Sequence, residues 1–260
     1  MNEGITSWTN RSGIVHEYWV EPENIPEYRE RMIEEIICEL DKDKSNTVMD
    51  CGCGTGLLFK YLPDEYKDRY YGVDFTQEMI DFCHEHYPEH KDRFRRMDLT
   101  KVSMIDHSYF DGHAVYVSQN VIQHILLFQE ALDTIFYGAK SMVLLCERTH
   151  FLASCIVGYE PAFRWRYNVQ DFYEVLLHFA EKYAYLGPVE ILGHPITTNN
   201  REKAVTMFRV YREIPGELSP SMVEEYREKY LIRERTVIRK WKPRPTKWQR
   251  VKQLFSSFFN

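Results

Sequence analysis

The 260-residue sequence predicts an α/β fold in which a mostly parallel, seven-stranded sheet is covered by helices on both faces. Three observations support this doubly wound arrangement. Short apolar segments alternate with amphipathic segments of about ten residues or more, as in consecutive βαβ units. A glycine-rich loop follows the first apolar segment, where such sheets commonly bind a ligand. A content of 44% hydrophobic residues is enough to form a sizeable core.

Apolar spacing defines the elements of the first half of the chain. Residues 22–41 place apolar side chains near one stripe and are expected to form a helix. The segment NTVMDC, at 46–51, indicates a short buried strand, which a glycine-rich loop and a helix follow. RYYGVDF at 69–75 predicts the second strand, TQEMIDFCHEHY at 76–87 a helix, and RFRRMDL at 93–99 the third strand.

The second half continues the alternation and then turns antiparallel. Strands four and five are expected at 111–119 and 141–148, with one helix over 120–139 between them. A further helix is predicted at 168–183. The last two strands, at 185–193 and 203–213, are expected to pair with each other at the edge of the sheet.

The loop in VMDCGCGTGLL, residues 48–58, narrows the class of ligand. A phosphate-binding P-loop needs Lys and then Ser or Thr after its last glycine, but two leucines follow Gly56. A nicotinamide fingerprint reads G-x-G-x-x-G, whereas the spacing here is G-x-G-x-G, preceded by Asp50. The loop therefore fits neither class.

An acid followed by x-G-x-G-x-G resembles the first motif of the class I S-adenosylmethionine-dependent methyltransferases. The resemblance extends over residues 45–147, through VDFTQEMI with Asp74, MDLT with Asp98, and VSQNVIQHI after the fourth strand. It implies a Rossmann-like methyltransferase fold, with S-adenosyl-L-methionine as cofactor and S-adenosyl-L-homocysteine as product.

The resemblance also implies a cofactor site. Asp74 would accept hydrogen bonds from both ribose hydroxyls, and Phe75 would lie against the adenine, whose edge would meet Asp98 and Leu99. Asp50 would steady the glycine loop or reach the amino group of the methionine portion indirectly. A helix N-terminal acid and a turn residue are the alternatives for Asp74 and Asp98. Tyr18 would also contact the cofactor, from an N-terminal segment folded over it; the alternative is that Tyr18 only packs against the protein. The full set of expected cofactor-binding residues is Asp50, Gly52, Cys53, Gly54, Gly56, Asp74, Phe75, Met79, Asp98, Leu99, Gln119 and Tyr18.

No metal site and no disulfide are expected. The six cysteines lack paired spacing, which in a cytosolic chain indicates reduced thiols. Cys83, His86 and His90 have nearly helical spacing, but Pro88 would break a helix between the last two.

The acceptor site is expected in an insertion at about 148–167. Arg164 and Arg166 flank Trp165 there, and two guanidinium groups among aromatic rings suit an anionic or sugar-like ligand. A packed loop with solvated arginines is the alternative. Candidate catalytic residues follow the fourth and fifth strands and face the expected pocket mouth: His124, Glu147 and His150. A hydroxyl acceptor would use one of these residues as a general base, whereas a phosphate or carboxylate acceptor needs no base. The alternative for His124 is a role in the core or as a helix cap.

Charge is distributed unevenly along the chain. Seven of the 33 basic residues and none of the 39 acidic residues lie from Arg239 onward, so the preceding body is more acidic than the total of −6 indicates. Such a body disfavours nucleic acid as partner. In the tail, Thr246 and Gln249 predict a helix start, and apolar residues from Trp248 to Phe259 share one face. The tail is expected to pack on protein or to bind an anionic membrane surface.

These features give a three-part organisation: an N-terminal helical lid segment at 1–44, a methyltransferase domain at 45–214, and a C-terminal helical extension with the basic tail at 215–260. The expected function is O-methylation of a small molecule or a surface-glycan intermediate by a cytoplasmic enzyme, peripheral on the inner membrane face if the tail binds lipid. Protein or peptide N-methylation, RNA methylation and a non-catalytic cofactor-binding regulator stay open as alternatives. The oligomeric state is left open.

Overall fold

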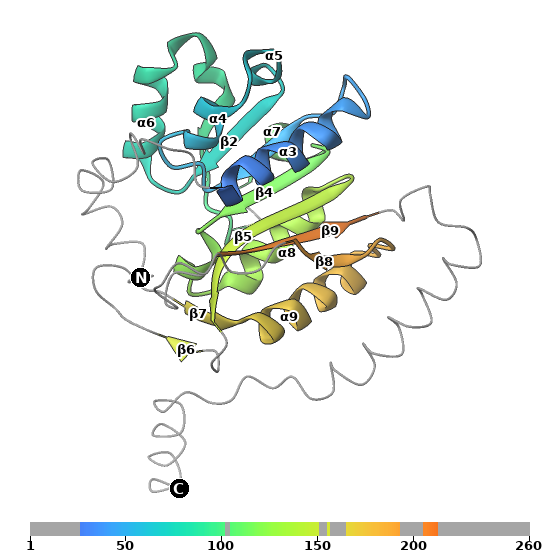
Figure 1. The fold of residues 1–260 in the computed structure, drawn as a ribbon. Helices are drawn as coiled ribbons and strands as arrows, with labels where there is room; N and C mark the ends of the chain where they lie inside the picture. Colours follow the sequence, from blue (N-terminus) through green and yellow to red (C-terminus); the bar gives the residue numbers. More distant parts are fainter. Residues whose placement is uncertain (1–26, 102–104, 151–154, 157–164, 193–204, 213–260) are drawn as a thin grey trace, which may run out of the picture. The chain divides into compact units, whose positions relative to one another are not determined.

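A mixed sheet with helices on both faces forms the described part of the chain (Figure 1). The computed structural model describes residues 27–101, 105–150, 155–156, 165–192 and 205–212. All of them belong to the first of two compact units, which spans Met1–Glu217. The doubly wound α/β fold predicted from the sequence is confirmed.

Seven strands in the order β3-β2-β1-β4-β5-β9-β8 make up the main sheet. The first five run parallel, whereas β9 is antiparallel to β5 and β8 is antiparallel to β9, which confirms the expected antiparallel edge. Two short strands extend the sheet beside the end of β5. The strands are β1 Val48–Cys51, β2 Tyr70–Asp74, β3 Phe94–Arg96, β4 Val115–Gln119, β5 Met142–His150, β6 Cys155–Ile156, β7 Trp165–Asn168, β8 Val189–Ile191 and β9 Val205–Tyr211.

The helices divide between the two faces of the sheet, with α3 across one face and α8 and α9 on the other (Figure 1). Alternate residues along a strand serve opposite faces. Val115 and Val117 of β4 belong to the core cluster that includes α3, α4 and α6, while the hydroxyl of Tyr116 between them donates to the carbonyl of Phe110 in α7. The helical segments are α3 Glu27–Asp41, α4 Leu57–Tyr61, α5 Asp64–Lys67, α6 Gln77–His86, η1 Pro88–Arg93, α7 His107–Phe110, η3 Ile122–His124, α8 Phe128–Gly138 and α9 Val169–Lys182.

One predicted helix is wrong in its extent. The single helix expected over 120–139 is a short 3₁₀ turn, η3, followed by α8, which begins only at Phe128. Asn120 adopts a left-handed conformation with φ of 56°, and the backbone N–H groups of Val121, Ile122 and Gln123 are bound by the buried carboxylate of Glu147. A side chain from the neighbouring strand therefore replaces the bonds that a continuous helix would make.

Two further features concern the thiols and the length of the helices. Cys38, Cys51, Cys53, Cys83 and Cys146 are free thiols. Among the helices of the described ranges, none is both long enough and apolar enough to cross a membrane.

An aromatic cluster under the first parallel strands predicts a large destabilisation on truncation. The Phe59 side chain is 1% exposed, and its ring lies 4.9–5.3 Å from the rings of Tyr70, Tyr87, His90 and Phe94, measured between centroids. Phe59→Ala is expected to lower the free energy of unfolding by roughly 3–5 kcal/mol, measured by urea denaturation. As a control, Leu186→Ala, at a residue 48% exposed, should cost less than about 0.5 kcal/mol. Equal costs would contradict the cluster's role.

Candidate active site

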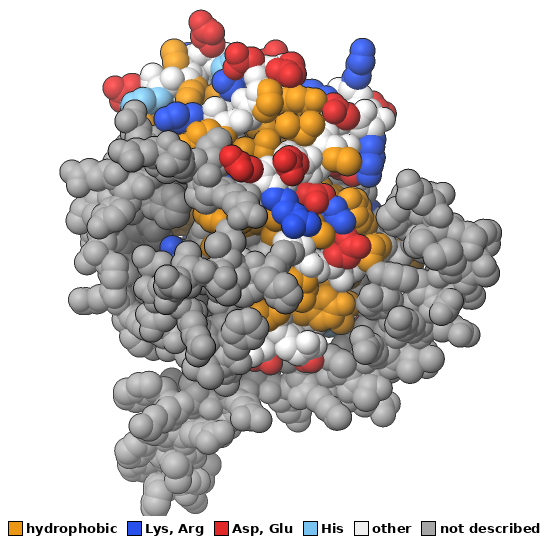
Figure 2. All heavy atoms as spheres, in the orientation of Figure 1, with side chains coloured by type: hydrophobic (Ala, Val, Ile, Leu, Met, Phe, Trp, Pro, Cys, Tyr) orange, Lys and Arg blue, Asp and Glu red, His pale blue; other side chains and the backbone are white. Residues whose placement is uncertain are grey.

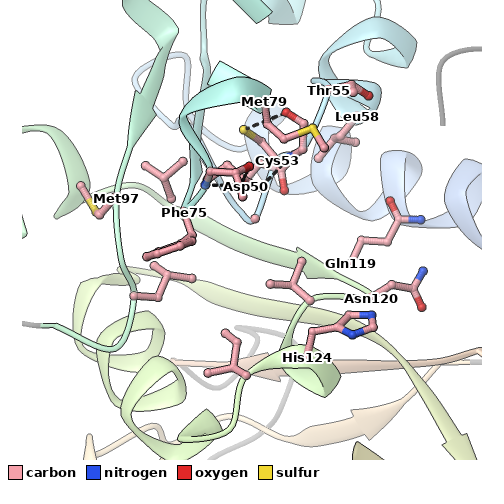
Figure 3. Close-up of a pocket in the computed structure, with 18 of the residues that line it drawn as sticks. Asp50, Cys53, Thr55, Leu58, Phe75, Met79, Met97, Gln119, Asn120 and His124 are labelled. Carbon is pink, nitrogen blue, oxygen red and sulfur yellow. Dashed lines mark hydrogen bonds between the residues drawn. The ribbon is translucent and has the colours of Figure 1, made fainter. Parts of the chain in front are cut away.

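A pocket opens at the carboxyl ends of β1, β2 and β4, next to the loop that follows β3 (Figure 3). This edge is where ligands bind in open parallel sheets. The walls bring together most residues that the sequence assigned to the cofactor, although they come from segments far apart in the chain. These lining residues are Asp50, Gly52, Cys53, Gly54, Asp74, Phe75, Met79, Asp98, Leu99 and Gln119, and the candidate catalytic residue His124 lines the same pocket.

The glycine loop takes a backbone path that side chains would obstruct. Gly52, Gly54 and Gly56 have φ of 89°, 53° and 73°. A Cβ atom on Gly52 would lie 2.4 Å from a methyl carbon of Val121, whereas one on Gly54 would meet no atom within 4 Å. Gly52 thus allows a close packing contact, and Gly54 leaves open space beside the loop. Gly56 does not line the pocket; it begins α4, and a Cβ there would lie 2.8 Å from the Tyr87 ring.

Asp74, at the end of β2, holds the loop and the start of α6 together. Its Oδ2 accepts the backbone N–H of Gly54 at 3.0 Å, and its Oδ1 accepts the N–H and hydroxyl of Thr76 at 2.9 and 2.7 Å. Burial raises the pKa of Asp74, and these donors oppose the rise. A carboxylate oxygen has two lone-pair directions, so the two donors of Thr76 fill Oδ1, whereas Oδ2 retains capacity to accept a ligand hydroxyl.

Asp98 lines the pocket and carries a buried acceptor without a hydrogen bond. The Oδ1 atom accepts the N–H and hydroxyl of Thr100 at 3.0 and 2.7 Å, but Oδ2 is buried without a hydrogen bond and has only the Lys101 ammonium at 3.4 Å. Buried acceptors are normally paired. An amino group such as that of adenine would supply the missing donor. S-adenosylmethionine carries several hydrogen-bond donors on its ribose and adenine. The open space at Gly54, the Asp74 carboxylate and the unpaired Oδ2 of Asp98 together fit such a ligand.

Asp50 lies beneath the loop and is 4% exposed. Burial raises its pKa to about 7, and the hydrogen bond from the Tyr70 hydroxyl, at 2.7 Å, opposes that rise. The Asp74 carboxylate raises the pKa further. The Asp50 carboxylate is thus tied to the neighbouring strand β2 through Tyr70.

The loop after β4 forms the wall opposite Phe75 (Figure 3). Asn120 and His124 line the pocket here, together with Gln119 from the strand end. The Oδ1 atom of Asn120 is buried and has no hydrogen bond in the structure. The loop after β4 therefore brings to the pocket wall an imidazole and an asparagine whose amide oxygen lacks a hydrogen bond.

Glu147 is a correction to the sequence analysis. It was expected to face the pocket mouth, but its side chain is fully buried and does not line the pocket. Its carboxylate accepts the N–H groups of Val121 and Ile122 at 3.1 Å, and that of Gln123 at 3.4 Å. Burial raises its pKa to about 8. Glu147 therefore holds the loop that carries His124 and does not touch an acceptor.

The other predicted site residues are not settled by the described ranges. Tyr18 and Arg164 lie outside them. His150 lies at the end of β5, and Trp165 and Arg166 begin β7, but only the backbone of these three is described.

Several lining residues were missed by the sequence analysis. Most belong to short loops beside recognised motifs, whose walls are set by tertiary packing. Arg29 of α3 left a readable signal, because it precedes Met32 by three residues and so falls on the buried face of that helix. The missed residues are Arg29, Thr55, Leu57, Leu58, Val73, Thr76, Met97, Thr100, Asn120, Val121 and Ile125. Within the described ranges, no three His, Cys, Asp or Glu residues form a group that could hold a metal ion.

Asp74→Ala is expected to weaken S-adenosylhomocysteine binding by roughly 30- to 1000-fold, measured by titration calorimetry. The change removes acceptors for the ligand and also releases the Gly54 N–H. Asp81→Ala, at an exposed acid of α6, is the matched control and should bind normally. Unchanged affinity in Asp74→Ala would remove this residue from the cofactor site.

Stability without cofactor is expected to fall as pH rises from about 5 to about 8.5. The pKa values of Asp50 and Glu147 rise from 3.8 and 4.5 to about 7 and about 8 in the folded protein. Between these values the folded state binds more protons, so the stabilisation is complete below the lower values and lost above the upper ones. Urea midpoints measured across this range should show a shallower decline for Glu147→Gln than for the wild type. His113, whose pKa burial lowers, contributes an opposite trend to both proteins and cancels in the comparison. Parallel curves would contradict the assignment.

The comparisons with known proteins agree with this site. Residues 49–139 match a family model described as a methyltransferase domain. No curated protein matches the sequence significantly. Magnesium protoporphyrin IX methyltransferase from Synechocystis PCC 6803, with bound S-adenosylhomocysteine, is 13% identical at a TM-score of 0.52, over 79% of this chain and 97% of that one. The methyltransferase domain of bacterial CtHen1 is 17% identical at a TM-score of 0.51, over 69% and 97%.

A third solved structure, from Rhodobacter sphaeroides and described as a putative zinc-dependent alcohol dehydrogenase, is 12% identical at a TM-score of 0.56, over 82% of this chain and 99% of that one. At these identities the likenesses to solved structures concern the fold alone. The family match carries more, because it spans the glycine loop, both strand-end acids and the loop with His124. Residues 49–139 are therefore a methyltransferase domain, and the chain is an enzyme whose glycine loop and strand-end acids fit S-adenosylmethionine as the methyl donor.

Proposed function

We propose that the protein methylates a hydroxyl oxygen of a small molecule or of a surface-glycan intermediate. The main support is the imidazole of His124 on the pocket wall formed after β4, beside the unsatisfied amide oxygen of Asn120. A hydroxyl must lose its proton when its oxygen is methylated, and histidine is the side chain best matched to that task near neutral pH.

Each part of the pocket has a role in this reaction. S-adenosylmethionine, when bound, supplies an electrophilic methyl group on a sulfonium. The glycine loop, Asp74 and Asp98 position that cofactor by its methionine, ribose and adenine portions. His124 accepts the proton of the hydroxyl that is methylated. The amide oxygen of Asn120 accepts a hydrogen bond from a second polar group of the same substrate. Positioning of the two reactants supplies much of the acceleration in such transfers.

Surface charge supports a small acceptor over a nucleic acid. On the face in Figure 2, the described residues carry acidic and basic side chains side by side. A nucleic-acid footprint instead gathers Lys and Arg on one surface. Among the described residues that line the pocket, Arg29 is the sole lysine or arginine.

The acceptor assignment is tested with S-adenosylmethionine labelled in its methyl group and panels of hydroxylated small molecules, glycans, peptides with free N-termini, and RNA. Methyl ethers on a hydroxylated acceptor are expected. His124→Gln should then reduce kcat by roughly 100- to 10,000-fold and leave S-adenosylhomocysteine affinity unchanged, whereas His178→Gln, in α9, should be neutral for both. Methylation of peptides alone would replace this proposal with peptide N-methylation, and cofactor binding without any product would favour a regulator.

A glycan intermediate is the narrower form of the proposal and rests on the sequence of the tail. Residues 215–260 lie outside the described ranges, but their basic and apolar pattern suits an anionic membrane surface, where lipid-linked glycans are modified. The full chain should sediment with anionic vesicles at low salt but not with neutral vesicles, and a chain ending at Lys240 should stay in the supernatant. If both forms stay in the supernatant, the glycan preference is withdrawn while hydroxyl methylation is unaffected.

A further inference from the structure

Arg29 is a buried cation at the edge of the cofactor pocket. It belongs to the first turn of α3, lines the pocket, and is 2% exposed. Removing a guanidinium from water is costly unless an anion compensates the charge. The partner of this side chain therefore decides what the residue does.

The partners of Arg29 in the described ranges are neutral. With the Gln119 amide turned to satisfy its neighbours, the amide oxygen accepts from the guanidinium Nη2 at 3.0 Å and Nε at 3.2 Å. The rings of Tyr28 and Tyr61 lie 5.9 and 5.8 Å from Cζ, measured to their centroids. Among the described residues, no carboxylate lies within 4.0 Å of the guanidinium. The positive charge is thus oriented by Gln119 but has no ionic partner among the described residues.

The surroundings of Arg29 indicate where an anion would be bound. Gln119 is the last residue of β4, and β4 pairs with β1, the strand that the glycine loop follows. The guanidinium bound to Gln119 therefore lies on the glycine-loop side of the pocket. Arg29 also lies within electrostatic range of Asp50, where it opposes the rise in pKa that burial causes. A cation and an acid beside the same loop match a ligand group that carries both charges.

We propose that Arg29 binds the carboxylate of the methionine portion of S-adenosylmethionine and S-adenosylhomocysteine. This carboxylate is the one anionic group of the cofactor, and its planar shape suits two parallel N–H donors of a guanidinium. Gln119 fixes the guanidinium plane and leaves other donors free for the ligand. Arg29 therefore selects for cofactors with an intact amino-acid portion.

The test compares two ligands that differ in this portion. S-adenosylhomocysteine carries the carboxylate, whereas 5′-methylthioadenosine has the adenosine and sulfur but lacks the amino acid. In calorimetry with the full chain, Arg29→Met should weaken S-adenosylhomocysteine binding by roughly 10- to 100-fold and leave 5′-methylthioadenosine binding within about twofold. Arg31→Met, at an exposed arginine of the same helix, is the matched control and should bind both ligands normally.

A second variant separates ligand binding from folding. Gln119→Glu places a carboxylate beside Arg29 and supplies the missing ionic partner from within the protein. It is expected to weaken S-adenosylhomocysteine binding selectively and to keep the thermal unfolding temperature of the ligand-free protein at or above that of the wild type. Equal loss for both ligands in Arg29→Met, or unchanged S-adenosylhomocysteine affinity in either variant, would overturn the proposal. Acceptor methylation enters none of these measurements, so the proposal stands or falls independently of the acceptor.

Discussion

The hydrogen bond between the Asp74 carboxylate and the Gly54 N–H is the constraint around which the pocket is arranged. It joins the loop after β1 to the end of β2, and the other oxygen of the same carboxylate holds Thr76 at the start of α6. Two crossovers of the sheet thus meet at one side chain. Because the loop also bonds to β2 through the N–H groups of Gly52 and Cys53, which donate to Val73, its path is fixed before any ligand binds.

A second carboxylate holds the opposite wall in the same manner. Glu147 of β5 binds the N–H groups that follow β4, and the Val121 side chain so positioned fills the space that a Cβ on Gly52 would occupy. The glycine loop and the loop with His124 are therefore in direct contact. This packing couples the cofactor end of the pocket to the wall that we assign to the acceptor, because neither loop can shift without the other.

The charged side chains that line the pocket come from different parts of the fold. Acids gather where β1, β2 and the segment after β3 reach the pocket, which suits a cofactor rich in hydrogen-bond donors. Among the described lining residues, the single guanidinium comes instead from α3, outside the consecutive strand–helix units. Burial of charged side chains, such as Arg29 and Asp50, strengthens their interaction with a zwitterionic ligand.

The sequence by itself determined the α/β alternation, the antiparallel edge and the cofactor loop, because these depend on short-range features: apolar periodicity, the spacing of the glycines and acids near the ends of strands. The same motifs place Asp50, Asp74 and Asp98 at one edge of the sheet. The tertiary structure decided what apolar periodicity does not encode. Glu147 and His124 lay in equally suggestive positions, yet one is buried by backbone donors of a neighbouring loop and the other lines the pocket. The break in the helix expected over 120–139 and the burial of Arg29 have the same origin, because both arise from contacts between residues distant in sequence.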